Sequence, residues 1–333
     1  MLQGRICAEL RERYRVLHSE VELDARVSGR LRHAAASRLD YPAVGDDVLF
    51  EHSADGPAIV HEVLPRRSCI VRKAAGTALD EQAIAANVDY LLVVCGLDGD
   101  FNVRRIERYA ALAASGGVSP VLVLNKADVC RDLDVKLLEL ADANVSMPIH
   151  VLSAALGDGL ESLEPYLCPA TTIALAGSSG AGKSTIANAL LGRTRQATSA
   201  VRSGDDRGRH TTTSRQMFRL PSGAFLIDTP GMRELHLWAD ADAIVDAFED
   251  IADLARACRF SDCTHQSEPD CAVRAALGNS LDEARFGNYQ KLLREQAYLE
   301  RKVDARAAAQ ERDRWKAIHR QAQEHMRFKG KLR

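Results

Sequence analysis

The sequence predicts a multidomain protein: a small N-terminal β-barrel, then an α/β domain, then an α-helical segment. Three observations support this. Residues 1 to about 72 alternate short apolar runs with turn residues, as small closed barrels do. From about residue 86, apolar strands alternate with helical patterns, which is typical of a parallel sheet covered by helices. Residues 288–329 lack glycine and proline, which indicates long helices.

The first domain is expected over residues 1–75 as an OB-type β-barrel, because five or six short strands fit that fold. The predicted strands are Arg5–Leu10, Tyr14–His18, Val21–Val27, Asp47–Glu51, Ala58–Leu64 and Cys69–Arg72. Barrels of this kind often bind nucleic acid on one face. The basic residues that could contact RNA are Arg26, Arg30, Arg32, His33 and Arg38, and further along Arg66, Arg67, Arg72 and Lys73.

The second domain is expected over residues 76–238 as a parallel sheet with helices on both faces. Its predicted strands are Asp89–Cys95, Pro120–Leu124, Ile149–Leu152, Thr172–Ala176 and Ala224–Ile227. Its predicted helices are Val103–Ala114, Leu133–Ala141, Leu160–Leu167 and Thr185–Leu191.

The stretch from Gly177 to Ser184 reads Gly-Ser-Ser-Gly-Ala-Gly-Lys-Ser between a predicted strand and a predicted helix, the setting of a P-loop. Glycines let successive N–H groups point at a phosphate, and the helix N-terminus adds positive potential. Lys183 is expected to reach the β and γ phosphates, and Ser184 to bind Mg²⁺. The residues expected to line this part of the site are Gly177, Ser178, Ser179, Gly180, Ala181, Gly182, Lys183, Ser184 and Thr185.

Two loops at predicted strand ends indicate that the base is guanine. Asn125-Lys126-Ala127-Asp128 matches the Asn-Lys-x-Asp signature of GTPases. Asp128 can accept from the N1–H and the exocyclic amine of guanine, a pair of donors that adenine lacks. The stem of Lys126 can lie on the base, and Asn125 can brace the loop. Ser153-Ala154 resembles the companion Ser-Ala-x motif, whose backbone supports the guanine oxygen.

A basic stretch after the P-loop helix ends in His210-Thr211-Thr212-Thr213, the expected place for a threonine that closes on Mg²⁺ and the γ-phosphate. Thr212 and Thr213 are both candidates for this Mg²⁺ ligand, and the sequence does not decide between them. In the later motif Asp228-Thr229-Pro230-Gly231, Asp228 is expected to hold Mg²⁺ through water, and the N–H of Gly231 to meet the γ-phosphate.

The base motif precedes the phosphate motif, the reverse of the order in ordinary small GTPases, and circular permutation of the sheet explains it. This order, the strand-rich domain ahead of it and the Arg-Gly-Arg-His-Thr-Thr-Thr stretch resemble the ribosome-small-subunit-dependent GTPase family of bacterial permuted GTPases. The resemblance covers essentially the whole chain. It implies a circularly permuted α/β P-loop GTPase domain that hydrolyses GTP to GDP. The implied partner is the small ribosomal subunit with its rRNA, which stimulates hydrolysis late in subunit assembly.

Met232 follows Gly231, where Ras-like GTPases usually carry the glutamine that orients the attacking water. A thioether cannot do that work, and the resembled family likewise has an apolar residue here. Hydrolysis must recruit another group, and His210 is the local candidate. The expected catalytic residues are His210, Lys183, Thr212 and Thr213.

The third domain is expected over residues 239–333 as an α-helical zinc-binding domain with a basic C-terminal tail, and a helix is predicted over Ala241–Ala257. Three thiolates and one imidazole suit tetrahedral Zn²⁺ and leave no position for a substrate, so one structural Zn²⁺ is expected. The ligands are Cys258, Cys263, His265 and Cys271, and the resemblance implies the same four. Buried thiols without metal are the alternative, but the polar residues around them make a poor core.

Charge is unevenly distributed along the chain. Residues 284–333 contain fourteen Lys and Arg against six Asp and Glu, whereas the whole chain has a net charge of −2. This basic arm suits an RNA backbone. No apolar run approaches the roughly 20 residues of a membrane span, and no signal-peptide pattern opens the sequence. We expect a cytoplasmic monomer with no membrane partner.

Other functions fit parts of the sequence. A P-loop small-molecule kinase would share the phosphate loop, but it does not need Asn-Lys-x-Asp. A non-catalytic zinc and RNA-binding protein would carry a vestigial nucleotide site, against which the intact Lys183, Ser184 and Asp228 argue. A permuted RNA-binding GTPase could also act on a different ribosomal particle.

Overall fold

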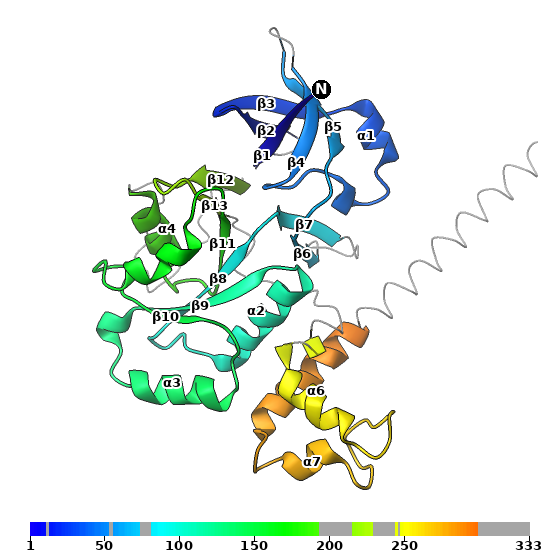
Figure 1. Ribbon diagram of the computed structural model, residues 1–333, viewed down its shortest axis with the longest axis vertical. Helices are drawn as coiled ribbons and strands as arrows, with labels where there is room; N and C mark the ends of the chain where they lie inside the picture. The colour runs from blue at the N-terminus through cyan, green and yellow to red at the C-terminus, as the bar shows by residue number, and fades with distance from the viewer. Residues whose placement is uncertain are drawn as a thin grey trace, which may run out of the picture.

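The computed structural model describes residues 1–10, 13–52, 56–73, 81–192, 215–228, 244–245 and 247–298. Figure 1 shows a barrel, then a sheet covered by helices, then a group of C-terminal helices. These are the OB-type barrel, the α/β domain and the helical C-terminal domain expected from the sequence. The predicted fold class is therefore confirmed.

Five strands form the barrel: β1 (Leu2–Leu10), β2 (Arg13–His18), β3 (Val21–Val27), β4 (Asp47–Glu51) and β5 (Ala58–Val63). They follow the order β1-β2-β3-β5-β4, and β4 pairs back with β1 to close the barrel. The helix α1 (Gly29–Ala34) follows β3 and begins where the hydroxyl of Ser28 accepts from the N–H of Leu31. The barrel interior is filled by Ile6, Val16, Val48, Phe50 and Val60.

A buried ion pair fastens the chain ahead of β4 to the chain after β5. Asp46 has no exposed surface, and its carboxylate accepts from Arg66 at 2.8 and 2.7 Å and from the N–H of Ala43 at 2.7 Å. Arg66 also donates to the carbonyls of Leu39 and Tyr41. Arg66 is therefore a structural residue of the barrel rather than one of the RNA-contacting residues expected from the sequence.

The barrel and the central sheet form one continuous eleven-stranded sheet. Parallel pairing joins β8 (Tyr90–Gly96), β9 (Ser119–Asn125), β10 (Ile149–Val151), β11 (Thr172–Ala176) and β13 (Phe225–Asp228) in the order β10-β9-β8-β11-β13. The strand β12 (Arg215–Arg219) lies between the parallel strands and the barrel, and it pairs antiparallel with both β13 and β1. The junction to the barrel is thus made by backbone hydrogen bonds.

Helices cover both faces of this sheet, as predicted. On one face, α2 (Val103–Ser115) and α3 (Leu133–Asp142) pack on Leu91, Val93 and Leu122. On the other face, α4 (Lys183–Leu191) and the 3₁₀ segment η3 (Leu160–Tyr166) pack on Leu92 and Val94. Alternate residues of β8 therefore supply the two cores.

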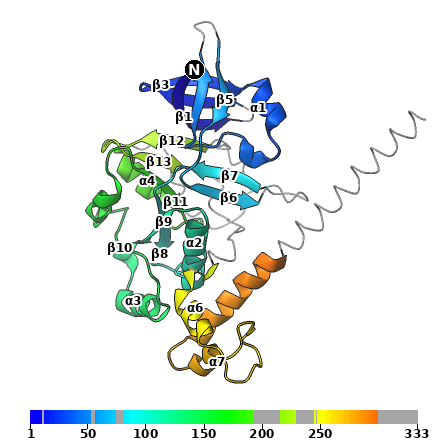
Figure 2. The same cartoon turned by 45° about the vertical axis from the view of Figure 1, so that its right-hand side comes forward.

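A hairpin of β6 (Cys69–Lys73) and β7 (Glu81–Ala86) lies between the barrel and α2 (Figure 2). It joins residues on the two sides of the domain boundary expected at residues 75 and 76. Neither β7 nor β12 was expected, because alanine and charged residues are poor strand formers. One pairing partner of β12, the strand β1, also lies far away in sequence.

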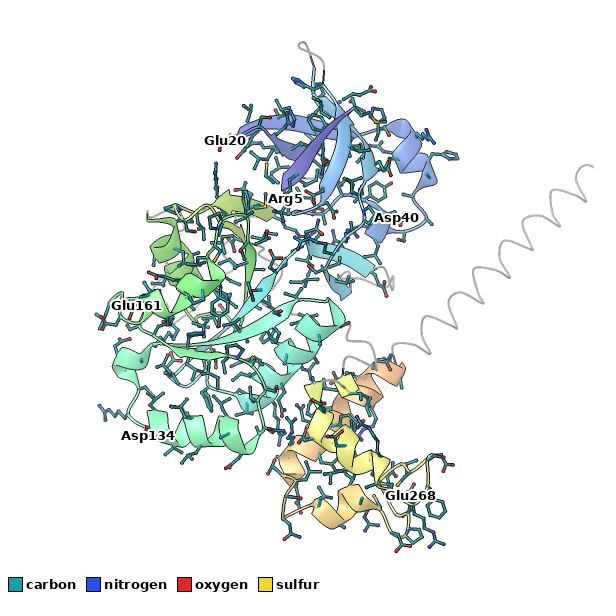
Figure 3. All side chains as sticks on the ribbon, in the orientation of Figure 1. Arg5, Glu20, Asp40, Asp134, Glu161 and Glu268 are labelled. Atoms are coloured by element: carbon teal, nitrogen blue, oxygen red, sulfur yellow. The ribbon has the colours of Figure 1, made fainter. Side chains whose placement is uncertain are left out.

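Two arginines lie at the junction between the barrel and the central domain. Arg5, labelled in Figure 3, donates to the carbonyls of Gly45 and Asn87 and to the hydroxyl of Thr172. Arg215 of β12 pairs with Glu9 of β1 at 2.6 Å and donates to Gln82 of β7. Side-chain contacts therefore connect the barrel to the central domain, in addition to the backbone hydrogen bonds between β1 and β12.

The C-terminal domain contains α6 (Glu249–Arg256), α7 (Ala272–Ala276) and a longer helix described over residues 283–298. Their shared core is formed by Phe248, Ile251, Val273, Phe286, Tyr289 and Leu292. The part of the basic tail beyond residue 298 lies outside the described residues. None of the described helices is long and apolar enough to cross a membrane.

We predict that Arg66→Met destabilises the barrel by about 3–5 kcal/mol, because it leaves the carboxylate of Asp46 buried and unpaired. Hydrogen exchange of the amides in β1–β5 should be faster, with smaller changes in the central sheet. Arg67→Met is the matched control, since its pair with Asp89 involves a side chain that is 66% exposed. Equal protection of the barrel in the two variants would contradict this interpretation.

Candidate functional site

The loop between β11 and α4 has the backbone of a phosphate cradle. Gly177 and Gly182 adopt φ angles of +136° and +100°. A Cβ on Gly177 would lie 2.1 Å from the carbonyl oxygen of Val94, and one on Gly182 would lie 2.0 Å from the side chain of Asn125. Only glycine fits either position. Lys183 donates to the carbonyls of Gly177 (2.7 Å) and Ser178, so its ammonium group lies within the loop.

Asn125 ties three loops together. It is buried at the end of β9, and its amide nitrogen donates to the carbonyl of Ala181 in the P-loop at 2.9 Å. Its amide oxygen accepts from the N–H of Ala154 at 3.0 Å. Both polar ends of one side chain are therefore used to join the Asn-Lys-x-Asp loop, the Ser-Ala loop and the P-loop.

The remaining residues of the base motif are positioned by neighbours. One carboxylate oxygen of Asp128 accepts from the hydroxyl of Ser153 at 2.6 Å. Lys126 adopts a left-handed φ of +68°, and its Nζ lies 2.5 Å from a carboxylate oxygen of Asp98. Partial burial opposes ionisation of Asp98, but hydrogen bonds from Lys126 and from the backbone of Asp100 lower its pKa.

Two acidic residues that were not expected from the sequence, Asp98 and Asp100, lie in the loop between β8 and α2. Asp98 contacts Lys126 of the base motif, whereas Asp100 accepts from the hydroxyl of Ser178 in the P-loop. Asp100 also accepts from Arg105 of α2 at 2.6 Å. The sequence does indicate this loop as part of a site, because it follows the carboxyl end of a parallel strand, where α/β sheets bind ligands.

Asp228 ends β13, which pairs in parallel with β11, so its backbone lies at the same edge of the sheet as the P-loop. Ser184 and Thr185 lie in the first turn of α4, and Ser179 and Gly180 lie in the loop before it. The predicted residues that lie outside the described part of the chain are His210, Thr212, Thr213, Gly231 and Met232.

A second cluster lies in the C-terminal domain. One ligand atom from each of Cys258, Cys263, His265 and Cys271 lies within 4.8 Å of all the others. The chain between α6 and α7 supplies all four residues, and the sulfur of Cys271 also accepts from the N–H of Arg274 at the start of α7. Three thiols and one imidazole at this spacing fit a single tetrahedral metal ion.

Glu268, labelled in Figure 3, holds the loop between His265 and Cys271 in shape. Its carboxylate accepts from the hydroxyl and N–H of Thr264 and from the N–H groups of Gln266 and Ser267. The hydrogen bonds from Thr264 are the main reason that the pKa of Glu268 falls to about 2. The ligand loop is therefore ordered by the protein's own hydrogen bonds.

Known proteins match this chain in sequence and in fold. Residues 63–238 match the model of the RsgA GTPase family. The small ribosomal subunit biogenesis GTPase RsgA of Opitutus terrae is 47% identical, across 99% of this chain and 93% of the relative. The crystal structure of YjeQ from Thermotoga maritima has a TM-score of 0.67 at 25% identity and covers 89% of this chain and 98% of its own.

The structure of YloQ, described as a circularly permuted GTPase, shares the fold with a TM-score of 0.62 at 22% identity, covering 89% of this chain and 94% of its own. The matches decide against a small-molecule kinase. The chain belongs to the RsgA GTPase family.

Proposed function

We propose that this protein hydrolyses GTP on the small ribosomal subunit and acts in the late maturation of that subunit, which stimulates the hydrolysis. The assignment of a guanine-nucleotide site rests on Asn125, whose buried side chain joins the Asn-Lys-x-Asp motif to the P-loop. The ribosomal part is supported by the relative from Opitutus terrae, which is named for small-subunit biogenesis.

Membership of a GTPase family implies a guanine nucleotide and Mg²⁺. In the proposed site the base is recognised by Asp128 and Lys126, supported by Ser153 and Ala154, and the phosphates lie on the P-loop. The hydroxyl of Ser184 and the carboxylate of Asp228 would hold Mg²⁺, since oxygen donors suit this ion. Bound Mg²⁺ would neutralise charge on the β and γ phosphates, as Lys183 does from the protein side.

The other residues proposed to take part in hydrolysis lie outside the described residues, and their roles are inferred from the sequence alone. Thr213 or Thr212 would complete the Mg²⁺ site, and the N–H of Gly231 would contact the γ-phosphate. His210 would orient the attacking water, since Met232 cannot.

Ribosomal RNA is proposed to be the part of the small subunit that this protein contacts. Five basic side chains are exposed on α1 and beside it: Arg26, Arg30, Arg32, His33 and Arg38. Exposed guanidinium groups at one end of a barrel suit phosphate contacts, and the basic tail adds a second positive region. The protein would act as a monomer in the cytoplasm, where ribosomal subunits mature.

The cluster of three cysteines and one histidine is proposed to hold one structural Zn²⁺. The four ligand atoms fill tetrahedral coordination, so the ion would stabilise the fold rather than take part in hydrolysis.

We predict that Cys263→Ala loses the metal and exposes the amides of residues 247–298 to faster hydrogen exchange, because metal binding there contributes to folding. Zinc should be measured in protein purified without chelator, with about one ion per chain in the parent. Cys168→Ala, at an exposed cysteine, is the control and should keep its zinc. A parent that contains no zinc would overturn the assignment.

The function itself is tested by GTP turnover. We predict slow hydrolysis by the isolated protein and acceleration on the order of 10³ by purified small subunits, but not by large subunits. His210→Ala should keep nucleotide affinity and subunit binding and lose most of the stimulated turnover. Met232→Ala should lose far less.

Stimulation by large subunits alone would indicate a different ribosomal particle. A His210→Ala variant with full stimulated kcat would show that rRNA, a ribosomal protein or another residue places the water.

A further inference from the structure

The helix α2 contacts the phosphate-binding loop with one face. Arg105 donates to the carboxylate of Asp100, which in turn accepts from the hydroxyl of Ser178. One turn later, Tyr109 is only 6% exposed, and burial raises the pKa of its hydroxyl while the nearby backbone of Gly177 opposes that rise. Two residues spaced four apart on α2 thus face the Gly177-Ser178 segment, Arg105 through Asp100 and Tyr109 beside the backbone of Gly177.

The opposite face of α2 contacts the C-terminal domain. Glu107 accepts from Arg285 and from Asn288, both at 2.5 Å, and Ala111 packs into the core of that domain. Residues 107 and 111 point about 200° around the helix from residues 105 and 109. Figure 2 shows α2 between the central sheet and the C-terminal helices. The helix therefore bridges the nucleotide site and the metal-cluster domain.

Arg285 is the centre of the contact with this face. Its guanidinium also pairs with Asp250 at 2.9 and 2.6 Å and lies over the ring of Phe248. The side chains of Arg285 and Glu107 are 3% and 4% exposed. Removing Arg285 leaves the carboxylate of Glu107 buried without its counter-charge. The structure can relieve this charge by moving α2, by opening the interface, or by protonating Glu107, whose pKa burial already raises.

We propose that Arg285 is a positioning residue for the phosphate-binding loop, acting through Glu107 and α2. Docking of the C-terminal domain and nucleotide binding then favour each other. This coupling must be reciprocal, so bound nucleotide also holds the C-terminal helices against α2.

The first test is the affinity for GDP, measured by calorimetry on the full-length protein. Arg285→Met should weaken GDP binding by about fivefold or more, the lower end of coupling between sites in proteins. Arg259→Met is the matched control, because it removes an exposed pair with Asp270 from the same domain, and it should bind within about twofold of the parent. Arg285→Lys restores a charge beside Glu107 and should recover part of the affinity.

The second test is reciprocity, which a purely structural role would not produce. Saturating GDP should slow hydrogen exchange in residues 283–298 of the parent, and this protection should be lost in Arg285→Met. Zinc content is measured in parallel, so that loss of the metal cluster is distinguished from loss of coupling.

If Arg285→Met does not fold, Glu107→Gln removes the charge at nearly constant shape and takes its place in both measurements. The proposal is overturned if the folded variant binds GDP within about twofold of the parent. It is also overturned if GDP leaves exchange in residues 283–298 of the parent unchanged.

Discussion

The nucleotide site depends on the buried side-chain amide of Asn125. Its two polar ends satisfy the carbonyl of Ala181 and the N–H of Ala154, which would otherwise be buried without partners. One side chain therefore fixes the distance between the Asn-Lys-x-Asp loop, proposed to recognise the base, and the P-loop, proposed to cradle the phosphates. The absence of a Cβ on Gly182 is what allows this approach.

The permuted order of the motifs is compatible with this geometry because the site belongs to an edge of the sheet and not to a direction along the chain. The strands β8, β9, β11 and β13 run in parallel, so the loops at their carboxyl ends converge. The loop after β8 adds Asp98 and Asp100 to the residues at this edge. Changing where the chain begins leaves that convergence intact.

The sequence was most informative where a motif needs particular residues at fixed spacing. The P-loop, Asn125, Asp128 and the four residues of the metal cluster stand out in the sequence because phosphate, guanine and a metal ion would each require particular partner groups at fixed spacing. Asp98 and Asp100 belong to no such motif, and their contacts with Lys126 and Ser178 arise from strands far apart in sequence. The same reason hides the strand β12, whose partner β1 lies about 200 residues earlier.

The ion pairs that join separate parts of this fold are buried, whereas those on its surface are exposed to water. Arg66 with Asp46, Arg215 with Glu9 and Arg285 with Glu107 each link segments distant in sequence and lie largely out of water. Arg66 shows why a basic residue cannot be assigned to RNA contact from its position in the sequence. Its guanidinium is instead held by the buried carboxylate of Asp46 in the barrel. The arginines around α1 and Arg67 are exposed, unlike Arg66.

Asp128 is proposed to recognise guanine in a site assembled from loops in permuted order. Direct binding of GTP and XTP to Asp128→Asn tests it, because the new amide no longer accepts from both guanine donors but can donate to the extra carbonyl of xanthine. We predict weaker GTP binding and stronger XTP binding than in the parent. An unchanged preference for GTP over XTP would contradict it.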